Sequence, residues 1–183
     1  MTVNLEIRDI MRHEYEVLGQ LMVQVYSNLD DFPTPTEQPS YYEMLANIGT
    51  FSEQKDTQVL VAISAERKMV GGVVYFGDMA VYGSGGTATA EKNASGIRLL
   101  GVDPRSRGTG VGKALTNTCI QLARDRGHSQ VILHTTQAMQ IAWALYEKLG
   151  FERSPDLDFA QEELPVFGFR LWLEGGGTPQ AQH

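Results

Sequence analysis

The chain has 183 residues, of which 42% are hydrophobic and 20% charged, and its 15 basic and 22 acidic side chains give a net charge of −7. This length is enough for one buried core and short for two full domains. A negative charge without a visible basic patch opposes binding to a nucleic-acid backbone, so no nucleic-acid partner is expected.

Cysteine usage and the first residues indicate the compartment. Cys119 is the single cysteine, so neither an intramolecular disulfide nor a cysteine metal cluster can form, and the scattered histidines predict no metal site. Charges interrupt the apolar residues Val3, Leu5 and Ile7, which leaves no stretch for export or for spanning a bilayer. A cytoplasmic protein without membrane contact is expected, with Cys119 as a small buried side chain.

The first half of the chain begins with a strand and two helices. Residues 3–7 alternate apolar and polar side chains, which predicts a strand with one buried face. Apolar residues recur every three or four positions over residues 13–29 and predict an amphipathic helix. The prolines within residues 30–36 end that helix, and a second helix is expected over residues 41–47.

Strands dominate the middle of the chain. Residues 59–63 and 69–76 are rich in β-formers and predict an antiparallel hairpin. Residues 77–96 lack a period and are rich in Gly, Ser, Thr and Ala, which indicates an exposed excursion. The next strand is predicted over residues 97–102.

The second half predicts a strand–helix–strand crossover. A helix over residues 111–126 joins the strand at 97–102 to one at 130–135, so these two strands should be parallel. A last helix spans residues 139–149 and ends at Gly150, where a left-handed cap is easily adopted. Closing strands follow at 151–153 and 166–173, and residues 175–183 are expected to be a disordered tail.

A glycine-rich turn precedes the helix at 111–126. Gly108, Gly110 and Gly112 leave the main chain bare where unpaired N–H groups and the helix dipole favour an anion, and the geometry suggests a pyrophosphate. A tight turn into the helix, with no ligand bound, would require the same three glycines. A Walker loop would need a hydroxyl where Ala114 stands, and a Rossmann turn would follow a first strand, so both nucleotide readings are weakened.

The chain resembles the GNAT superfamily of N-acetyltransferases. Arg107, Gly110 and Gly112 meet its Arg/Gln-x-x-Gly-x-Gly/Ala hallmark directly after a strand, and residues 142–151 look like its Ala-x-x-Leu-Tyr-x-x-x-Gly-Phe segment. The resemblance covers residues 3–173. It implies an α/β (α+β) fold in one domain over residues 1–174, with a mixed, mostly antiparallel twisted sheet of about six to seven strands, a central parallel pair and about four flanking helices.

The resemblance also implies a site for acetyl-coenzyme A. The pyrophosphate would be held by the amides of residues 107–112 with Lys113 near the phosphates, and the pantetheine arm would pair with the main chain at residues 100–102. The implied cofactor residues are Leu100, Gly101, Val102, Arg107, Gly108, Thr109, Gly110, Val111, Gly112, Lys113 and Ala142. Tyr146 matches the family's general acid, because a phenol is protonated at neutral pH and can donate to the departing thiolate.

Two catalytic details stay open in the sequence. Many members have an asparagine seven residues before the tyrosine, where this chain has Met139, so that one contact with the coenzyme is in question. His134 is a candidate general base or simply the last part of a strand, and Glu43 is a more remote candidate.

The sequence therefore predicts an N-acetyltransferase that moves an acetyl group to an amine by direct attack in a ternary complex. The acceptor would be a small molecule, peptide or protein, touching residues 32–43, and a homodimer is left open. The alternatives are a non-catalytic acyl-coenzyme A sensor, or a nucleotide- or phosphate-binding module.

Overall fold

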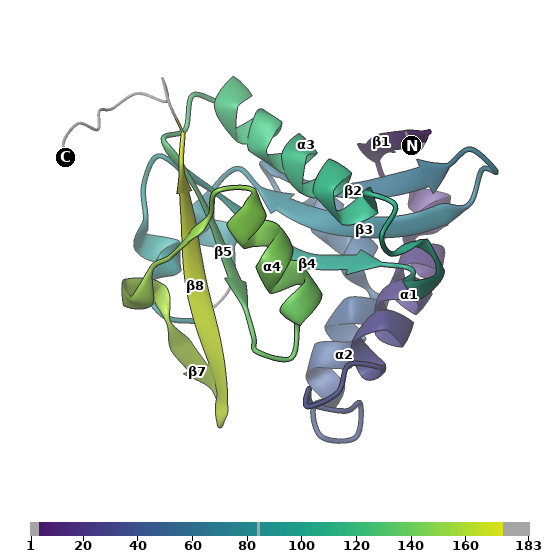
Figure 1. Cartoon of the computed structure of the whole chain (residues 1–183), viewed down its shortest axis with the longest axis horizontal. Helices are drawn as coiled ribbons and strands as arrows, with labels where there is room; N and C mark the ends of the chain where they lie inside the picture. The colour runs from purple at the N-terminus through teal and green to yellow at the C-terminus, as the bar shows by residue number, and fades with distance from the viewer. Residues whose placement is uncertain (1–3, 84, 174–183) are drawn as a thin grey trace. The chain divides into compact units, whose positions relative to one another are not determined.

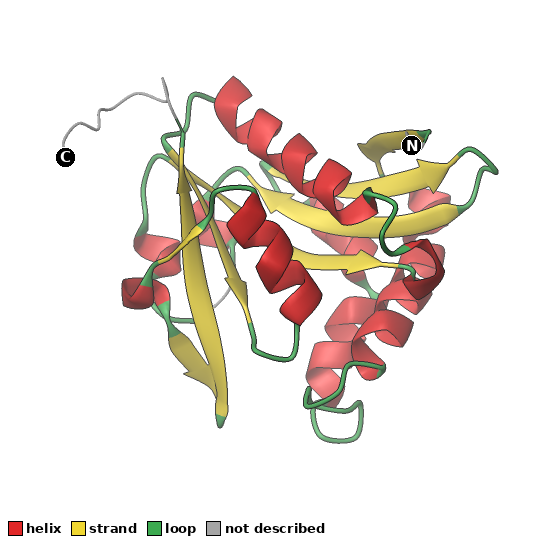
Figure 2. Ribbon diagram, viewed as in Figure 1, coloured by secondary structure: helices red, strands yellow, loops and turns green. Residues whose placement is uncertain are grey.

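The structure is a computed structural model that describes residues 4–83 and 85–173 (Figures 1 and 2). The strands are β1 (Leu5–Asp9), β2 (Thr57–Ser64), β3 (Met69–Phe76), β4 (Ala94–Val102), β5 (Gln130–Thr135), β6 (Glu152–Arg153), β7 (Phe159–Gln161) and β8 (Leu164–Trp172). The α-helices are α1 (Tyr15–Ser27), α2 (Pro39–Ala46), α3 (Val111–Asp125) and α4 (Gln140–Lys148), with short 3₁₀ turns between elements.

The strands pair in the order β1-β2-β3-β4-β5-β8-β6, and β7 pairs with β8. β4 and β5 are parallel, with Ala94 opposite Gln130 and Ile97 opposite Leu133. β1 and β2 are antiparallel, as are the pairs that β8 makes with β5, β6 and β7. The mixed, mostly antiparallel sheet with one parallel pair is as predicted, and the three-residue β7 is the strand that the sequence did not reveal.

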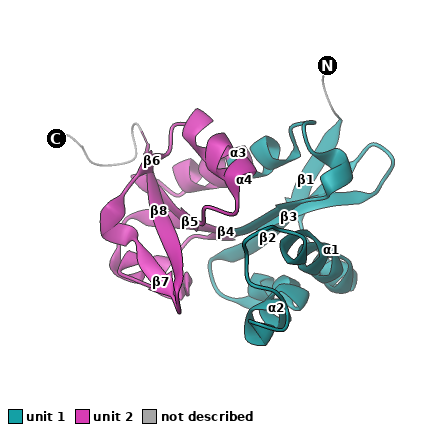
Figure 3. Cartoon of the chain, turned by 60° about the horizontal axis from the view of Figure 1, so that its bottom comes forward, with its two compact units in different colours: residues 1–74, 99–116 teal, residues 75–98, 117–183 magenta. Residues whose placement is uncertain are grey.

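The described residues form two compact units (Figure 3). Unit 1 comprises the residues up to 74 together with 99–116, and unit 2 comprises 75–98 and the residues from 117 onward. The single domain over residues 1–174 stays a prediction. The tail predicted for residues 175–183 lies outside the described residues.

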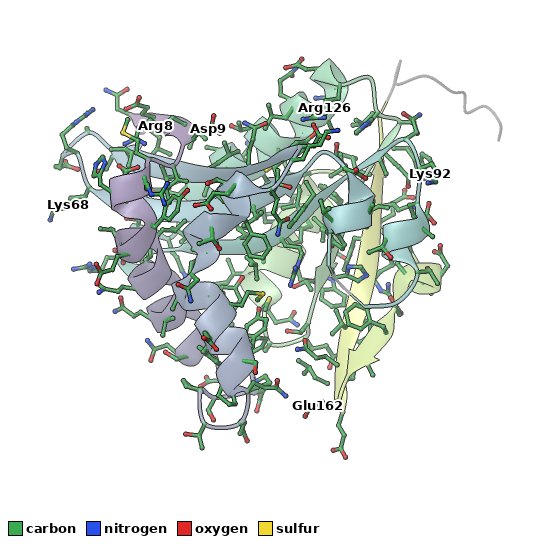
Figure 4. The ribbon with its side chains drawn as sticks, turned by 180° about the vertical axis from the view of Figure 1, so that it is seen from behind. Arg8, Asp9, Lys68, Lys92, Arg126 and Glu162 are labelled. Carbon is green, nitrogen blue, oxygen red and sulfur yellow. The ribbon has the colours of Figure 1, made fainter. Side chains whose placement is uncertain are left out.

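In unit 1, one face of α1 is buried, and the helix follows a turn that is held by hydrogen bonds to the Glu14 carboxylate. Leu18 and Met22 are fully buried on the helix, as its periodicity predicted. Before it, the Glu14 carboxylate accepts from the Met11 N–H at 2.9 Å and forms two bonds of 2.7 and 2.9 Å with the Arg8 guanidinium, labelled in Figure 4. These bonds lower the pKa of Glu14 to about 2, so the carboxylate is ionised at neutral pH and keeps its hydrogen bonds to Arg8 and Met11.

α1 and α2 approach each other at a glycine. A Cβ at Gly19 would lie 2.1 Å from the carbonyl oxygen of Ala46, the last residue of α2. No side chain larger than hydrogen fits there, so the sequence sets how closely the two helices pack. The second helix begins at Pro39, two residues before the predicted start, since proline suits the first helical turn.

In unit 2, the segment before β4 differs from its prediction. β4 begins at Ala94 and not at residue 97, and the 3₁₀ turn Met79–Val81 lies within the preceding segment. Met79, Tyr82 and Ala88 are buried, so the expectation of an exposed excursion is wrong for these residues. Lys92 and Arg126, both labelled in Figure 4, are exposed.

The boundaries of α3 and α4 lie within two residues of those predicted from the sequence. Gly150, which follows α4, has a φ of 101°, as its predicted left-handed cap requires. Cys119 on α3 is fully buried, as predicted, and burial raises the pKa of its thiol. Among residues 4–83 and 85–173, no helix is long and apolar enough to cross a membrane, and no group of three or more His, Cys, Asp or Glu could hold a metal ion.

Candidate functional site

The turn that follows β4 in unit 1 is anchored by Asp103. Its backbone N–H donates to the carbonyl of Val70 on β3 at 2.8 Å, and its carboxylate accepts from the Arg105 backbone N–H at 3.0 Å. The Arg105 guanidinium also donates to this carboxylate at 3.0 and 3.2 Å and holds the pKa of Asp103 below its usual range. The turn therefore starts from a fixed point next to β3.

The glycines open the turn at its exposed end. Gly108 and Gly110 have φ values of 81° and 89°, and a Cβ at either would meet no atom within 4 Å. This backbone conformation is costly for other residues, which explains both glycines. Gly112 lies within α3 and does not have a positive φ.

Backbone donors are unpaired along this turn. The first bond into α3 runs from the Ala114 N–H to the Gly110 carbonyl at 3.0 Å, and no protein acceptor for the N–H groups of residues 108–113 is found among the described residues. Unpaired amides at a helix N-terminus, with room around two glycines, form an anion site. The residues present thus fit the pyrophosphate of coenzyme A.

The end of β4 contributes backbone with an unusual conformation. Leu99 is buried with a φ of 63°, which is a strained value for leucine. The Leu100 carbonyl accepts from the Tyr26 hydroxyl at 2.8 Å, and a Cβ at Gly101 would lie 2.4 Å from the Met22 sulfur. Gly101 thus lets α1 approach β4, a packing reason for a glycine that the sequence suggested only for the cofactor.

Tyr26 was absent from the candidate residues, although it lies four positions after Met22 on the same helix face. It packs with aromatic rings of the region expected to contact the acceptor, 5.8 Å from Phe32 and 6.2 Å from Tyr41 between ring centroids. Phe32 and Tyr41 are themselves 5.7 Å apart. Glu43, the remote base candidate, is exposed on α2.

Tyr146 lies on α4 in unit 2 and is 5% exposed. Burial raises the pKa of its hydroxyl, and the nearby Cys119 and Tyr82 raise it further, so the phenol is protonated at neutral pH. Its ring packs against Phe151 at 5.7 Å. No partner for its hydroxyl is found within the described part of the chain, which leaves this proton available to a ligand.

His134 on β5 is held by both ring nitrogens. Nε2 lies 2.9 Å from the Leu157 carbonyl, which can only accept, so Nε2 carries the proton and Nδ1 accepts from the Tyr82 hydroxyl at 2.9 Å. Burial is the main reason that the pKa of His134 is lowered. The ring is therefore neutral but has no free lone pair in this arrangement.

The predicted residues divide between the units. Unit 1 holds Leu100, Gly101, Val102 and the turn from Arg107 to Lys113, and unit 2 holds His134, Ala142 and Tyr146. Lys113 is exposed in the first turn of α3, and Ala142 is half-buried on α4. The functions of these residues stay predictions.

Comparison with known proteins identifies the class. A profile of the acetyltransferase (GNAT) family matches residues 22–151, and the chain belongs to this family. Acetyl transfer from acetyl-coenzyme A is the activity of the family. Solved structures agree on the fold: the PaiA N-acetyltransferase of Thermoplasma acidophilum, in complex with coenzyme A, has a TM-score of 0.72 at 13% identity over 93% of this chain and 99% of its own.

A GNAT-family acetyltransferase of Staphylococcus aureus Mu50 has a TM-score of 0.68 at 18% identity, over 93% of this chain and all of its own. Sequence relatives match over a shorter stretch. Human N-acetyltransferase 8B is 46% identical over 55 residues, and the mycothiol acetyltransferase of Thermobispora bispora is 47% identical over 57. These matches span 30% and 31% of this chain, and only 24% and 19% of the relatives' own length.

Proposed function

We propose that this chain is an N-acetyltransferase that moves the acetyl group of acetyl-coenzyme A directly to an amine within a ternary complex. The observation that carries the proposal is the run of unpaired backbone N–H groups at residues 108–113, at the start of α3. Such donors bind a pyrophosphate without any side chain, and the open space around Gly108 and Gly110 admits it.

Further roles follow for individual groups. The main chain of Leu100 and Val102 would pair with the pantetheine arm as an added strand, with Ala142 near the cofactor. Tyr146 would protonate the departing thiolate, since burial keeps its phenol protonated and its hydroxyl has no other partner among the described residues. The amine must attack in its neutral form, and holding both reactants together supplies much of the rate.

We also propose where the acceptor binds and which residue acts as the base. We place an amine of a small molecule, peptide or protein beside residues 32–43, where Phe32 and Tyr41 pack together. His134 would serve as base only after one of its two hydrogen bonds opens. We further propose a cytoplasmic location, in keeping with the single cysteine.

The test is coenzyme A release from acetyl-coenzyme A, measured over a broad panel of amines. Turnover with at least one amine is expected, and Tyr146→Phe should lower kcat by about 10²-fold or more while it retains cofactor binding. Tight cofactor binding without turnover on any amine would contradict catalysis. Calorimetric preference for ATP or NAD over acetyl-coenzyme A would contradict the cofactor itself.

A second candidate is a sensor that binds acyl-coenzyme A without reacting it. It is favoured by one observation: the histidine expected as base has both nitrogens engaged. Loss of turnover in Tyr146→Phe with binding retained would reject the sensor.

A further inference from the structure

Three aromatic side chains form a cluster in unit 1, on α1, α2 and the connection between them (Figure 3). Tyr26, Phe32 and Tyr41 lie 5.7–6.2 Å apart between ring centroids, and we call them the aromatic cluster. Tyr26 is 3% exposed, whereas Phe32 and Tyr41 are half-buried, so part of each of these two rings reaches solvent. An aromatic ring attracts an ammonium group through its negative face.

The segment around this cluster holds the whole net charge of the chain. Residues 13–54, which include α1, α2 and their connection, contain seven of the 22 acidic side chains and neither Lys nor Arg. The rest of the chain therefore has 15 acidic and 15 basic side chains, which balance, so the net charge of −7 belongs to residues 13–54. Net charge keeps a protein soluble wherever it lies, but solubility does not account for its concentration in one segment.

Four of the seven carboxylates flank the aromatic cluster along the chain and are exposed. They are Asp30, Asp31, Glu37 and Glu43. None of the four forms an ion pair within the described part of the chain, whereas Glu14 is paired with Arg8. Burial, and after it the Glu37 carboxylate, raise the pKa of the Tyr42 hydroxyl, so Glu37 lies near a ring that is 5.8 Å from Tyr41. These carboxylates are therefore available to a cation from solution.

Tyr26 connects the aromatic cluster to the strand that the proposed function assigns to the cofactor. Its hydroxyl donates to the Leu100 carbonyl at 2.8 Å. An acceptor amine that attacks beside this strand therefore lies within one side chain of the aromatic cluster. That amine must be neutral, and nearby carboxylates favour its protonated form, so they hinder the reacting nitrogen. They favour a second amino group of the same acceptor, which stays protonated.

We propose that the acceptor is a small diamine whose second amino group, as an ammonium, binds the aromatic cluster and the carboxylates that flank it. The inference rests on the proposed function and names the acceptor class for it. Phe32 and Tyr41 would hold the ammonium by cation–π contact, and Asp30 and Asp31, which directly precede Phe32, would supply the opposite charge. A monoamine lacks the second charge, and an amino acid adds a carboxylate that these acidic residues repel.

The experiment compares three acceptors with similar chains and different far ends: 1,4-diaminobutane, butylamine and 4-aminobutyrate. Initial rates of coenzyme A release should give a kcat/KM that is about 10-fold or more higher for the diamine than for butylamine, and lowest for 4-aminobutyrate. A factor of about two comes from the two equivalent ends of the diamine alone. The preference should shrink with added salt, because ions screen exposed charges.

Two variants of the proposed site locate the effect. Asp30→Asn/Asp31→Asn removes two charges, and asparagine tolerates the φ of 62° at Asp31. It should lower kcat/KM for the diamine by about 3- to 10-fold and leave the value for butylamine within about 2-fold of the wild type. Phe32→Leu, which removes the ring and keeps an apolar side chain, should lower the diamine value by about 2- to 5-fold.

Glu162→Gln/Glu163→Gln is the matched control. These two acidic residues are also adjacent and exposed, and Glu162, labelled in Figure 4, has a φ of 57°, but they lie in the turn between β7 and β8 of unit 2. Their replacement changes the net charge by the same amount and should leave the preference for the diamine unchanged.

Four results would overturn the inference. A kcat/KM for the diamine equal to or below that for butylamine, once the two ends are allowed for, would reject the diamine and leave the proposed function standing. Equal losses in the two double variants would assign the preference to net charge and not to the aromatic cluster. An equal loss with butylamine in Asp30→Asn/Asp31→Asn would mean that these residues support the local fold. Turnover with no amine at all would reject the proposed function as well.

Discussion

The hydroxyl of Tyr26 links α1 to the strand proposed to receive the cofactor. It donates to the Leu100 carbonyl at 2.8 Å, and Leu100 follows the strained Leu99. A bond at this point restricts the direction of the carbonyl before any ligand arrives. Pre-ordering of a binding strand lowers the entropy lost on association.

Removing this bond should affect both stability and binding. Tyr26→Phe keeps the ring, so we expect a loss of about 1 kcal/mol in the free energy of unfolding, measured with urea. The affinity for acetyl-coenzyme A should fall by roughly 2- to 10-fold, because the Leu100 carbonyl is no longer held in place.

Tyr42→Phe provides the comparison, since the Tyr42 hydroxyl also donates to a carbonyl, that of Pro33 at 2.6 Å. It should lower stability to a similar extent with cofactor affinity unchanged. Equal effects of the two variants on affinity would contradict a specific role for Tyr26.

At the level of single residues, sequence reasoning reached those with a motif and missed those defined by surroundings. Arg107, Gly110 and Tyr146 belong to recognisable patterns. Tyr26 belongs to no such pattern, because its hydrogen bond reaches a residue 74 positions further along the chain. His134 was found, but its two hydrogen bonds come from residues 52 and 23 positions away along the chain.

At the scale of elements, the turn into α3 combines two functions in one stretch of main chain. It ends the connection from β4, and it leaves the N–H groups of residues 108–113 unpaired. A left-handed conformation at Gly108 and Gly110 is what makes the amides accessible.

Gly110→Ala should therefore weaken the proposed pyrophosphate site. An alanine at a φ of 89° is strained by about 1–2 kcal/mol even with open space around it, so the turn should rearrange. We expect acetyl-coenzyme A affinity to fall about 10-fold or more, measured by calorimetry, with a modest fall in Tm.

The other end of α3 offers a matched control. Gly127 has a φ of 76° and equally open surroundings, but it lies after the helix. Gly127→Ala should lower Tm to a similar extent and leave cofactor affinity unchanged. If both variants bound acetyl-coenzyme A as well as the wild type, the turn would not be the site.

The long periodic elements were the most predictable. α3 and β5 have the predicted boundaries within one residue, because periodicity and the glycines near its ends mark α3, and a run of β-forming residues marks β5. β7 was missed, since three residues hold no readable period, and its partner β8 follows a turn at Glu162 with a φ of 57° (Figure 4). The buried turn at Met79–Val81 was missed because composition alone suggested exposure.

For the whole molecule, the Arg8–Glu14 ion pair and two partly buried histidines affect stability in two different ranges of pH. The pKa of Glu14 is lowered from 4.5 to about 2, so its contribution to stability is present above about pH 4.5 and is lost as the pH falls from there to about 2. His134 and His128 have lowered pKa values, chiefly through burial, and thus favour the neutral ring in the folded state.

Stability should consequently decline from about pH 7 to pH 5. The unfolded chain binds protons on histidine near pH 6.5 while the folded chain resists them, so acidification favours unfolding, and the contribution is complete above pH 6.5. In urea titrations, His134→Gln should be less stable than the wild type at pH 8 and should show a shallower decline below pH 7.

A decline of the same steepness in His134→Gln would show that the buried ring does not cause it.

The placement of Cys119 has a practical consequence. Its thiol is fully buried, so a coloured disulfide reagent should not label the native protein. The same reagent can therefore count each thiol freed during turnover without a background from the enzyme. In denaturant the thiol becomes accessible, so the rate at which the reagent labels it measures how fast the core around α3 unfolds.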